Sequence, residues 1–201
     1  MLVRQPGELG RYADGIVKEM HHRSWSRLFN ELDVSGDVTP VPPERLDAFE
    51  SKNGIKLPAS YREYCSVFGP GRLIGVISLK IVVPGEQSWP WLAELSLFNE
   101  HMASVDPIEI DEYCSEPKLW RNGLFFGDDN GNMFFWNKGE VTDNTTNEMG
   151  VYLVERSMQI HRITDTFESF VFGNCLEHSV INWSKSKKSD PAEYWAGVNG
   201  P

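Results

Sequence analysis

The sequence predicts an α+β fold, in which an antiparallel-rich or mixed β-sheet carries helices packed mainly on one face. Helical periodicity prevails up to residue 68, and strand-like stretches recur between residues 73 and 163. One further helical segment follows at 166–172. A block of helices followed by a block of strands is typical of an α+β domain.

Three helices are expected in the first third of the chain. Apolar residues recur at three- and four-residue steps over 7–32, which predicts an amphipathic helix. A second helix begins at Pro43 and ends before Gly54, where glycine readily adopts the left-handed conformation. Pro58 opens a third helix, which presents Tyr61 to the core.

Strands are expected from residue 73 onwards. The stretch 73–83 predicts one or two strands, and 91–105 has a weaker helical pattern. Later strand-like stretches lie at 124–127, 133–137, 151–155 and 158–163. The turn residues 128–132 between the first two of these predict an antiparallel hairpin.

The chain divides into one domain and two flanking segments. Its 201 residues are enough for a single core, and 40% of them are hydrophobic. We assign residues 40–183 to the domain, 1–39 to an N-terminal helical extension and 184–201 to a flexible polar tail.

The composition also limits the class of partner. The net charge of −10 repels nucleic acid and anionic membranes and attracts basic surfaces. No stretch approaches the ~20 apolar residues of a membrane helix, and residues 1–11 lack the apolar core of a signal peptide. We therefore expect a cytoplasmic protein with a protein partner and with neither nucleic acid nor a membrane as partner.

The cysteines and histidines give no sign of a catalytic or metal centre. Cys65, Cys114 and Cys175 are odd in number and widely spaced, which predicts buried reduced thiols. His21 and His22 are adjacent on the first predicted helix, so they point about 100° apart and do not converge on one metal. We expect no catalytic residues, no metal and no cofactor.

One segment begins like a calcium-binding loop. Asp128, Asn130 and Asn132 would supply oxygen ligands at positions 1, 3 and 5. Met133 replaces the glycine of position 6, and Gly139 replaces the glutamate of position 12. The segment therefore predicts a hairpin turn and not a calcium site.

Three groups of residues resemble the SUKH superfamily, which includes Smi/Knr-like domains. A proline-led acidic helix at 42–50 is followed by the G-hydrophobic-x-LP-x-x-Y pattern of 54–64. A strand, a Gly/Asp turn and an aromatic strand follow at 126–136, and a last helix lies near 167–171. The residues that carry the resemblance are Gly54, Leu57, Pro58, Tyr61, Gly127, Asp128, Gly131 and Phe170.

The resemblance implies a function without catalysis. Many bacterial members of the superfamily bind and neutralise a toxin domain, and fungal members are regulators. We therefore predict a protein-binding module, an immunity protein for a basic toxin domain. The alternatives are a regulatory or scaffold protein and an unrecognised hydrolase whose catalytic residues assemble only in space.

The acidic segment 106–116 is the strongest candidate for the contact surface. It holds five acids and no Lys or Arg. Its acids would steer a basic partner, and an aromatic side chain would supply the buried anchor. The candidate partner-binding residues are Asp106, Glu109, Asp111, Glu112, Tyr113, Glu116 and Trp120. The alternative interpretation is a charged loop that serves only solvation.

Overall fold

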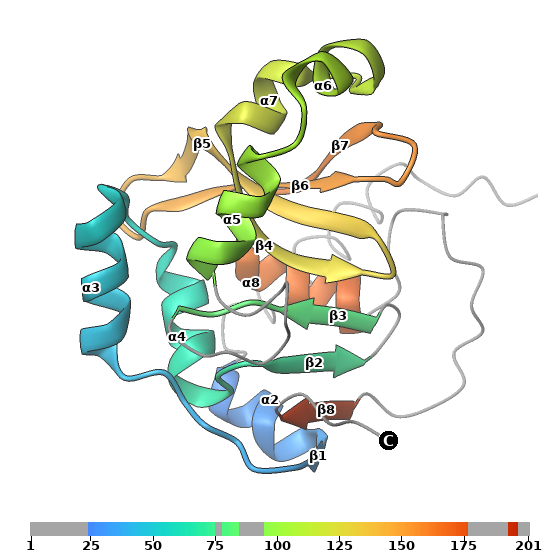
Figure 1. Ribbon diagram of the computed structural model, residues 1–201. Helices are drawn as coiled ribbons and strands as arrows, with labels where there is room; N and C mark the ends of the chain where they lie inside the picture. Colours follow the sequence, from blue (N-terminus) through green and yellow to red (C-terminus); the bar gives the residue numbers. More distant parts are fainter. Residues whose placement is uncertain (1–23, 75–77, 85–94, 177–192, 197–201) are drawn as a thin grey trace, which may run out of the picture.

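The computed structural model describes residues 24–74, 78–84, 95–176 and 193–196 (Figure 1). Within them, eight strands form one sheet in the order β1-β8-β2-β3-β4-β5-β6-β7. The strands are β1 (Asp33–Ser35), β2 (Gly71–Ile74), β3 (Ser78–Ile81), β4 (Gly123–Asp129), β5 (Asn132–Asp143), β6 (Glu148–Val154), β7 (Ile160–Thr164) and β8 (Glu193–Ala196). Only β1 and β8 pair in parallel, so the predicted α+β class with an antiparallel-rich, mixed sheet is confirmed.

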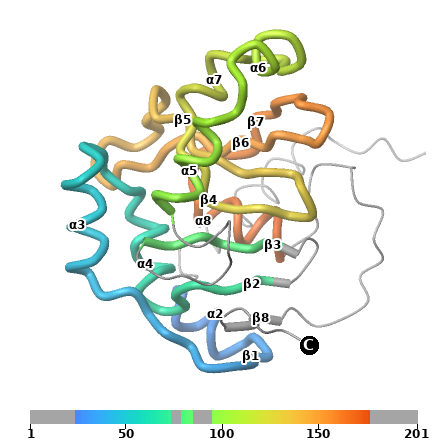
Figure 2. The backbone as a smooth tube through the Cα atoms, viewed as in Figure 1, coloured from blue at the N-terminus to red at the C-terminus, as the bar shows by residue number. Residues whose placement is uncertain are grey.

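Helices cover both faces of this sheet. They are α2 (Trp25–Glu31), α3 (Pro43–Asn53), α4 (Ala59–Val67), α5 (Leu95–Ala103), α6 (Pro107–Tyr113), α7 (Pro117–Asn122), α8 (Phe167–Ser169) and the π-helical turn η2 (Phe170–Leu176). In Figure 2, α5 crosses the near side of the sheet and α8 lies behind it. Every residue of β6 is buried, as expected for a strand covered on both sides.

Aromatic side chains fill the face that packs against α4 and α8. Phe126 of β4 stacks on Trp136 of β5 with ring centroids 4.2 Å apart. Tyr61 of α4 meets the same Trp136 edge-on at 4.8 Å, and Phe167 of α8 meets Phe126 at 5.4 Å. Such edge-to-face and offset contacts add to the stabilisation from burial alone. This layer is the centre of the hydrophobic core.

The described part of the N-terminal extension belongs to the same core. Trp25 of α2 is buried and packs edge-on against Tyr64 at 5.5 Å, and it also contacts Phe167 and Phe172. Only the end of the helix predicted over 7–32 falls within the described residues, and there it forms α2; residues 1–23, with His21 and His22, lie outside them.

The predicted ends of two helices are confirmed. Gly54 follows α3 with φ +64°, the left-handed conformation that glycine adopts without steric cost. Pro58 lies at the N-cap of α4, which begins one residue later, and Leu57 is buried beside it. Because these signals are local to the helix ends, the sequence alone reveals them.

The segment that resembles a calcium loop forms the predicted hairpin turn. Asn130 and Gly131 both have positive φ, and Asp129 is paired with Asn132, as in a two-residue type I′ turn. An oxygen of Asp128 accepts the Gly131 N–H at 2.9 Å, and Lys80 lies 3.4 Å from the same carboxylate. The Asp128 side chain therefore closes the turn.

Part of the predicted polar tail belongs to the sheet. Residues 193–196, expected within a flexible tail at 184–201, form β8 between β1 and β2. The pairing depends on backbone groups of two distant strands, which the local composition of the tail does not reveal. Residues 177–192 and 197–201 lie outside the described residues.

A buried carboxylate joins helices α4 and α8 to the sheet. Glu148 begins β6 and is 5% exposed. Its oxygens accept the Ser60 N–H and the Ser60 hydroxyl, each at 2.9 Å, and the Phe167 N–H at 3.3 Å. Both N–H groups lie in the first turn of a helix, where backbone donors have no partner within the helix.

We expect Glu148→Ala to lower the free energy of unfolding by about 3 kcal/mol, because it leaves buried N–H groups without an acceptor. Urea unfolding at pH 7 measures this effect. Glu63→Ala, at an exposed position of α4, is the matched control and should change stability by less than about 0.5 kcal/mol. Equal stability of the two variants would contradict the assigned role of Glu148.

Candidate functional site

The acidic segment folds into a helix and its flanking residues. A carboxylate oxygen of Asp106 accepts the Ile108 N–H at 2.8 Å, and Pro107 is the first helical residue of α6. This is the usual combination of an aspartate cap and a proline at the first helical position. Ile110 is the only buried residue of α6, so a single side chain packs this helix against the rest of the protein.

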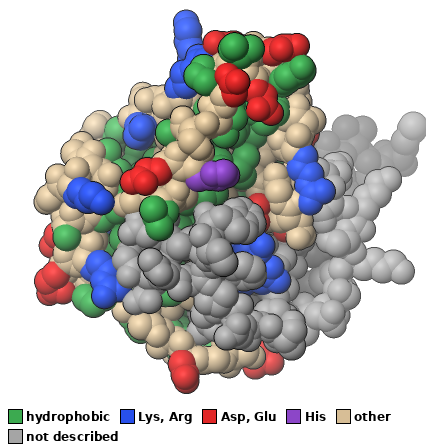
Figure 3. Space-filling view, viewed as in Figure 1, with side chains coloured by type: hydrophobic (Ala, Val, Ile, Leu, Met, Phe, Trp, Pro, Cys, Tyr) green, Lys and Arg blue, Asp and Glu red, His purple; other side chains and the backbone are tan. Residues whose placement is uncertain are grey.

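The other side chains of this segment form what we call the α6 surface, which is acidic and apolar together. All five of its acids are exposed, Ile108 is 72% exposed and Tyr113 is 58% exposed. Figure 3 shows acidic and hydrophobic side chains gathered at the end of the molecule formed by α6. The α6 surface comprises Asp106, Ile108, Glu109, Asp111, Glu112, Tyr113 and Glu116.

The acids of the α6 surface differ in how far they are already engaged. Asp106 caps its own helix, and Asp111 forms a 2.7 Å salt bridge with Arg121 of α7. Glu109, Glu112 and Glu116 form no salt bridge with the described residues. The charges of these three side chains are therefore available to a partner.

Trp120 does not belong to the exposed surface, contrary to the sequence prediction. It is 5% exposed, and its ring lies 5.0 Å from that of Phe125 on the sheet. As an apolar residue of α7, which follows the acidic segment, it packs inward and holds α7 against the sheet. Tyr113 is the aromatic residue of this region that remains exposed.

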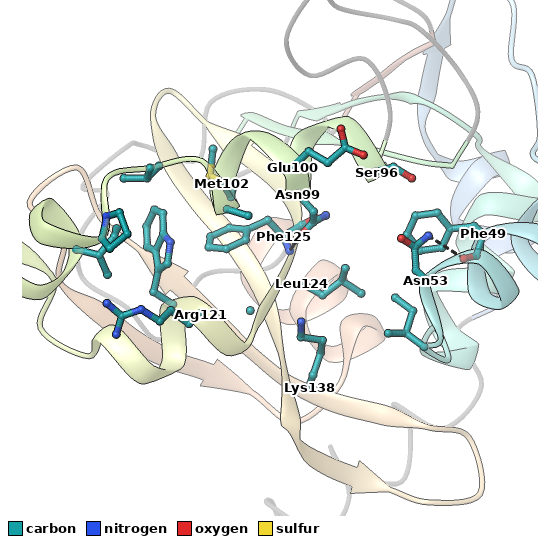
Figure 4. A pocket seen from close by; sticks show the side chains of 17 residues that line it. Phe49, Asn53, Ser96, Asn99, Glu100, Met102, Arg121, Leu124, Phe125 and Lys138 are labelled. Atoms are coloured by element: carbon teal, nitrogen blue, oxygen red, sulfur yellow. Dashed lines mark hydrogen bonds between the residues drawn. The ribbon is translucent and has the colours of Figure 1, made fainter.

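Beside the α6 surface lies a cleft of about 470 Å³. Its walls come from the end of α3, one side of α5, the start of α6, α7 and the neighbouring parts of β4 and β5. Figure 4 shows the Lys138 side chain directed into this cleft, with Arg121 on one side and Glu100 across from it. The floor is apolar and includes Leu124 and Phe125.

An asparagine on α5 fixes this side of the sheet. The Asn99 amide donates to the Phe125 carbonyl at 2.9 Å and accepts the Phe125 N–H at 2.8 Å. The last paired residue of β3 is Ile81, opposite Gly127, so Asn99 takes the place of a strand for Phe125. Sequence reasoning missed Asn99, because its partner lies 26 residues away and leaves no periodic signal.

The loop after α3 contributes Ile55 to the wall of the cleft. This loop is held by Glu50, which is 5% exposed. Its carboxylate accepts the Leu57 N–H at 2.9 Å and pairs with Lys56 at 3.1 Å and Arg62 at 2.9 Å. Burial raises the pKa of Glu50, but these hydrogen bonds and the Arg62 charge outweigh burial and lower the pKa overall. The charged carboxylate thus fixes the loop between α3 and α4.

Two buried thiols are poor nucleophiles. Burial raises the pKa of Cys65 and of Cys175 far above the usual value for cysteine, so both remain protonated at neutral pH. All three cysteines are free and buried, as the sequence predicted.

None of the helices in the described ranges is long and apolar enough to cross a membrane.

Because the pKa of Glu50 is lower in the folded than in the unfolded chain, its contribution to stability is present at neutral pH. It is lost as the pH falls through the folded-state pKa. We expect Glu50→Gln to be less stable than the parent by about 2 kcal/mol at pH 7, and this difference to shrink below about pH 4. Urea unfolding between pH 3 and pH 7 measures it. A difference that does not change with pH, as expected for Glu63→Gln, would exclude the role of the Glu50 charge.

The model of the SMI1 / KNR4 family (SUKH-1) matches residues 40–173, about two thirds of the chain. The matched range includes the Glu50 loop, the β4–β5 hairpin, the α6 surface and α8. No curated protein matches the chain.

Proposed function

The chain belongs to the SMI1 / KNR4 family (SUKH-1), and from this membership we propose that it is a non-catalytic module that binds a basic protein. The partner is a toxin domain, and the chain neutralises it as an immunity protein. Inhibition is steric: the bound module covers the toxin's functional surface and no reaction follows.

The observation that carries the proposal is the α6 surface. Five exposed acids surround two exposed hydrophobic side chains, Ile108 and Tyr113. In protein interfaces, exposed charges steer encounter and fix orientation, whereas buried apolar and aromatic groups supply most of the affinity. The net charge of −10 extends the attraction for a basic partner beyond the contact area.

The way in which α6 is held supports the same role. Ile110 of α6 is buried, and the salt bridge between Asp111 and Arg121 joins α6 to α7, whose Trp120 packs on Phe125 of the sheet. A binding surface held on a fixed scaffold loses less entropy when the complex forms. The α6 surface therefore suits tight binding by a preformed site.

We expect the full-length protein, used as bait, to retain a basic toxin domain from its source cell and to inhibit that domain at a ratio of one to one. Glu109→Gln with Glu112→Gln should weaken the affinity about tenfold at low salt, because two exposed attractions are lost. The loss should shrink as salt rises. Affinity capture, followed by titration of toxin activity, measures both effects.

The matched control is Glu44→Gln with Glu63→Gln. It removes the same charge from exposed positions of α3 and α4, and Glu44, like Glu109, lies in the first turn of its helix. The control should bind like the parent. Equal loss in both double variants would assign the attraction to net charge and not to the α6 surface. Retention of a partner whose activity is unaffected would favour a regulatory scaffold over an immunity protein.

A further inference from the structure

A second, smaller hollow lies on the other side of α5 from the cleft. It has a volume of about 300 Å³ and is bounded by α5, the start of α6, the β4–β5 turn and the β6–β7 turn. In Figure 1 both turns lie at the same side of the sheet, below α6. Its apolar lining consists of Phe98, Met102, Val105, Trp120, Met133 and Met158.

Methionine is concentrated in this hollow, which holds three of the chain's six. Met133 and Met158 are only partly buried, so their side chains reach the surface. Methionine is flexible and polarisable, makes favourable contacts with aromatic rings and is common at protein surfaces that accept apolar side chains. Such a lining suits an inserted aromatic group.

The backbone at Met158 gives an independent indication. The Met158 N–H donates to the Glu155 carbonyl at 2.8 Å, and the Glu155 N–H donates to the Gln159 carbonyl at 2.9 Å. This is a three-residue hairpin loop whose last residue is left-handed, a position that normally holds glycine. Met158 has φ +64° there.

A long side chain at such a position is unfavourable for folding alone. The backbone hydrogen bonds of the loop, including the one from the Ser115 N–H to the Met158 carbonyl at 3.1 Å, need no particular side chain. Glycine or asparagine would make the same bonds with less strain. Disfavoured backbone conformations of this kind concentrate at functional sites.

Charge at the rim indicates what kind of group enters. Glu109 of the α6 surface lines the hollow, together with His101 and Asp128. Asp128 is already engaged by Lys80 and by the Gly131 N–H, so Glu109 is the carboxylate that can receive a cation. The Arg156 side chain lies against Gly131 at the β4–β5 turn, so cationic neighbours of an entering side chain would face Glu109 and not this turn.

We propose that the hollow is the receptor for an aromatic side chain of the partner, flanked by Lys or Arg residues that face Glu109. This inference rests on the proposed function, which it deepens by assigning the anchor to the partner. The volume, at the lower end of the ~300–1,000 Å³ of small-molecule pockets, suits one large side chain. Apolar anchors that fill such hollows commonly dominate the affinity of an interface.

The test uses the full-length protein with ¹³C-labelled methionine methyl groups and two pentapeptides, KRFKR and KRAKR. KRFKR should shift the signals of Met102, Met133 and Met158 saturably, and KRAKR should bind at least about tenfold more weakly. Equal binding of the two peptides, or shifts that avoid these methionines, would overturn the proposal.

Two variants separate binding from folding. Met158→Asn should weaken KRFKR binding at least about tenfold and leave the free energy of unfolding equal or higher, because asparagine tolerates the left-handed conformation. Val105→Phe should fill the hollow and weaken KRFKR binding similarly, while Glu44→Gln with Glu63→Gln should not. If Met158→Asn lowers stability and leaves the KRFKR affinity unchanged, Met158 has a structural role only and the proposal is wrong.

The two hypotheses fail separately. If a basic toxin domain is captured in a manner that depends on Glu109 and Glu112, but Met158→Asn and Val105→Phe bind it normally, the hollow is not the receptor and the proposed function stands. If KRFKR occupies the hollow but no toxin is retained, the receptor stands and the immunity function does not.

Discussion

The fold depends on the buried carboxylate of Glu148, which joins α4 and α8 to the start of β6. Removing a charged Glu148 from water is unfavourable, and this cost is offset only because three donors from two helices converge on it. The same contacts position two residues of the aromatic layer. Tyr61 directly follows Ser60, and the N–H of Phe167 is itself one of the donors. The position of the aromatic layer therefore follows from where β6 begins.

Aromatic side chains pack on both faces of the sheet, and the exposed α6 surface adjoins the face toward α5 and α7. The face toward α4 and α8 is a continuous aromatic layer. On the opposite face Phe98 and Trp120 pack on Phe125, and the hydrogen bonds between Asn99 and Phe125 add a polar contact. Since α6 buries only Ile110, most of its side chains are free of packing constraints and can serve a partner.

The features that could be predicted from the sequence are those that neighbouring residues determine. Gly54, Pro58 and the Asn130-Gly131 turn each specify a backbone conformation from neighbouring residues alone, and all three were correctly located. The burial of Trp120, the partner of Asn99 and the pairing of β8 depend on residues far along the chain. No periodicity carries such information, which is why the acidic segment was found but its supporting residues were misassigned or missed.

Trp120 connects the corrected prediction with the proposed binding mode. It lines both the cleft and the methionine-rich hollow, as do Met102 of α5 and Val105 between α5 and α6, so these three side chains form a wall common to both. An interface needs an anchor and a receptor for it, and either protein can supply either one. In the proposed mode the aromatic residue next to the acidic segment is part of the receptor, and its burial is what gives the hollow a firm wall. The acids of α6 then set the orientation in which a basic partner presents its own aromatic group.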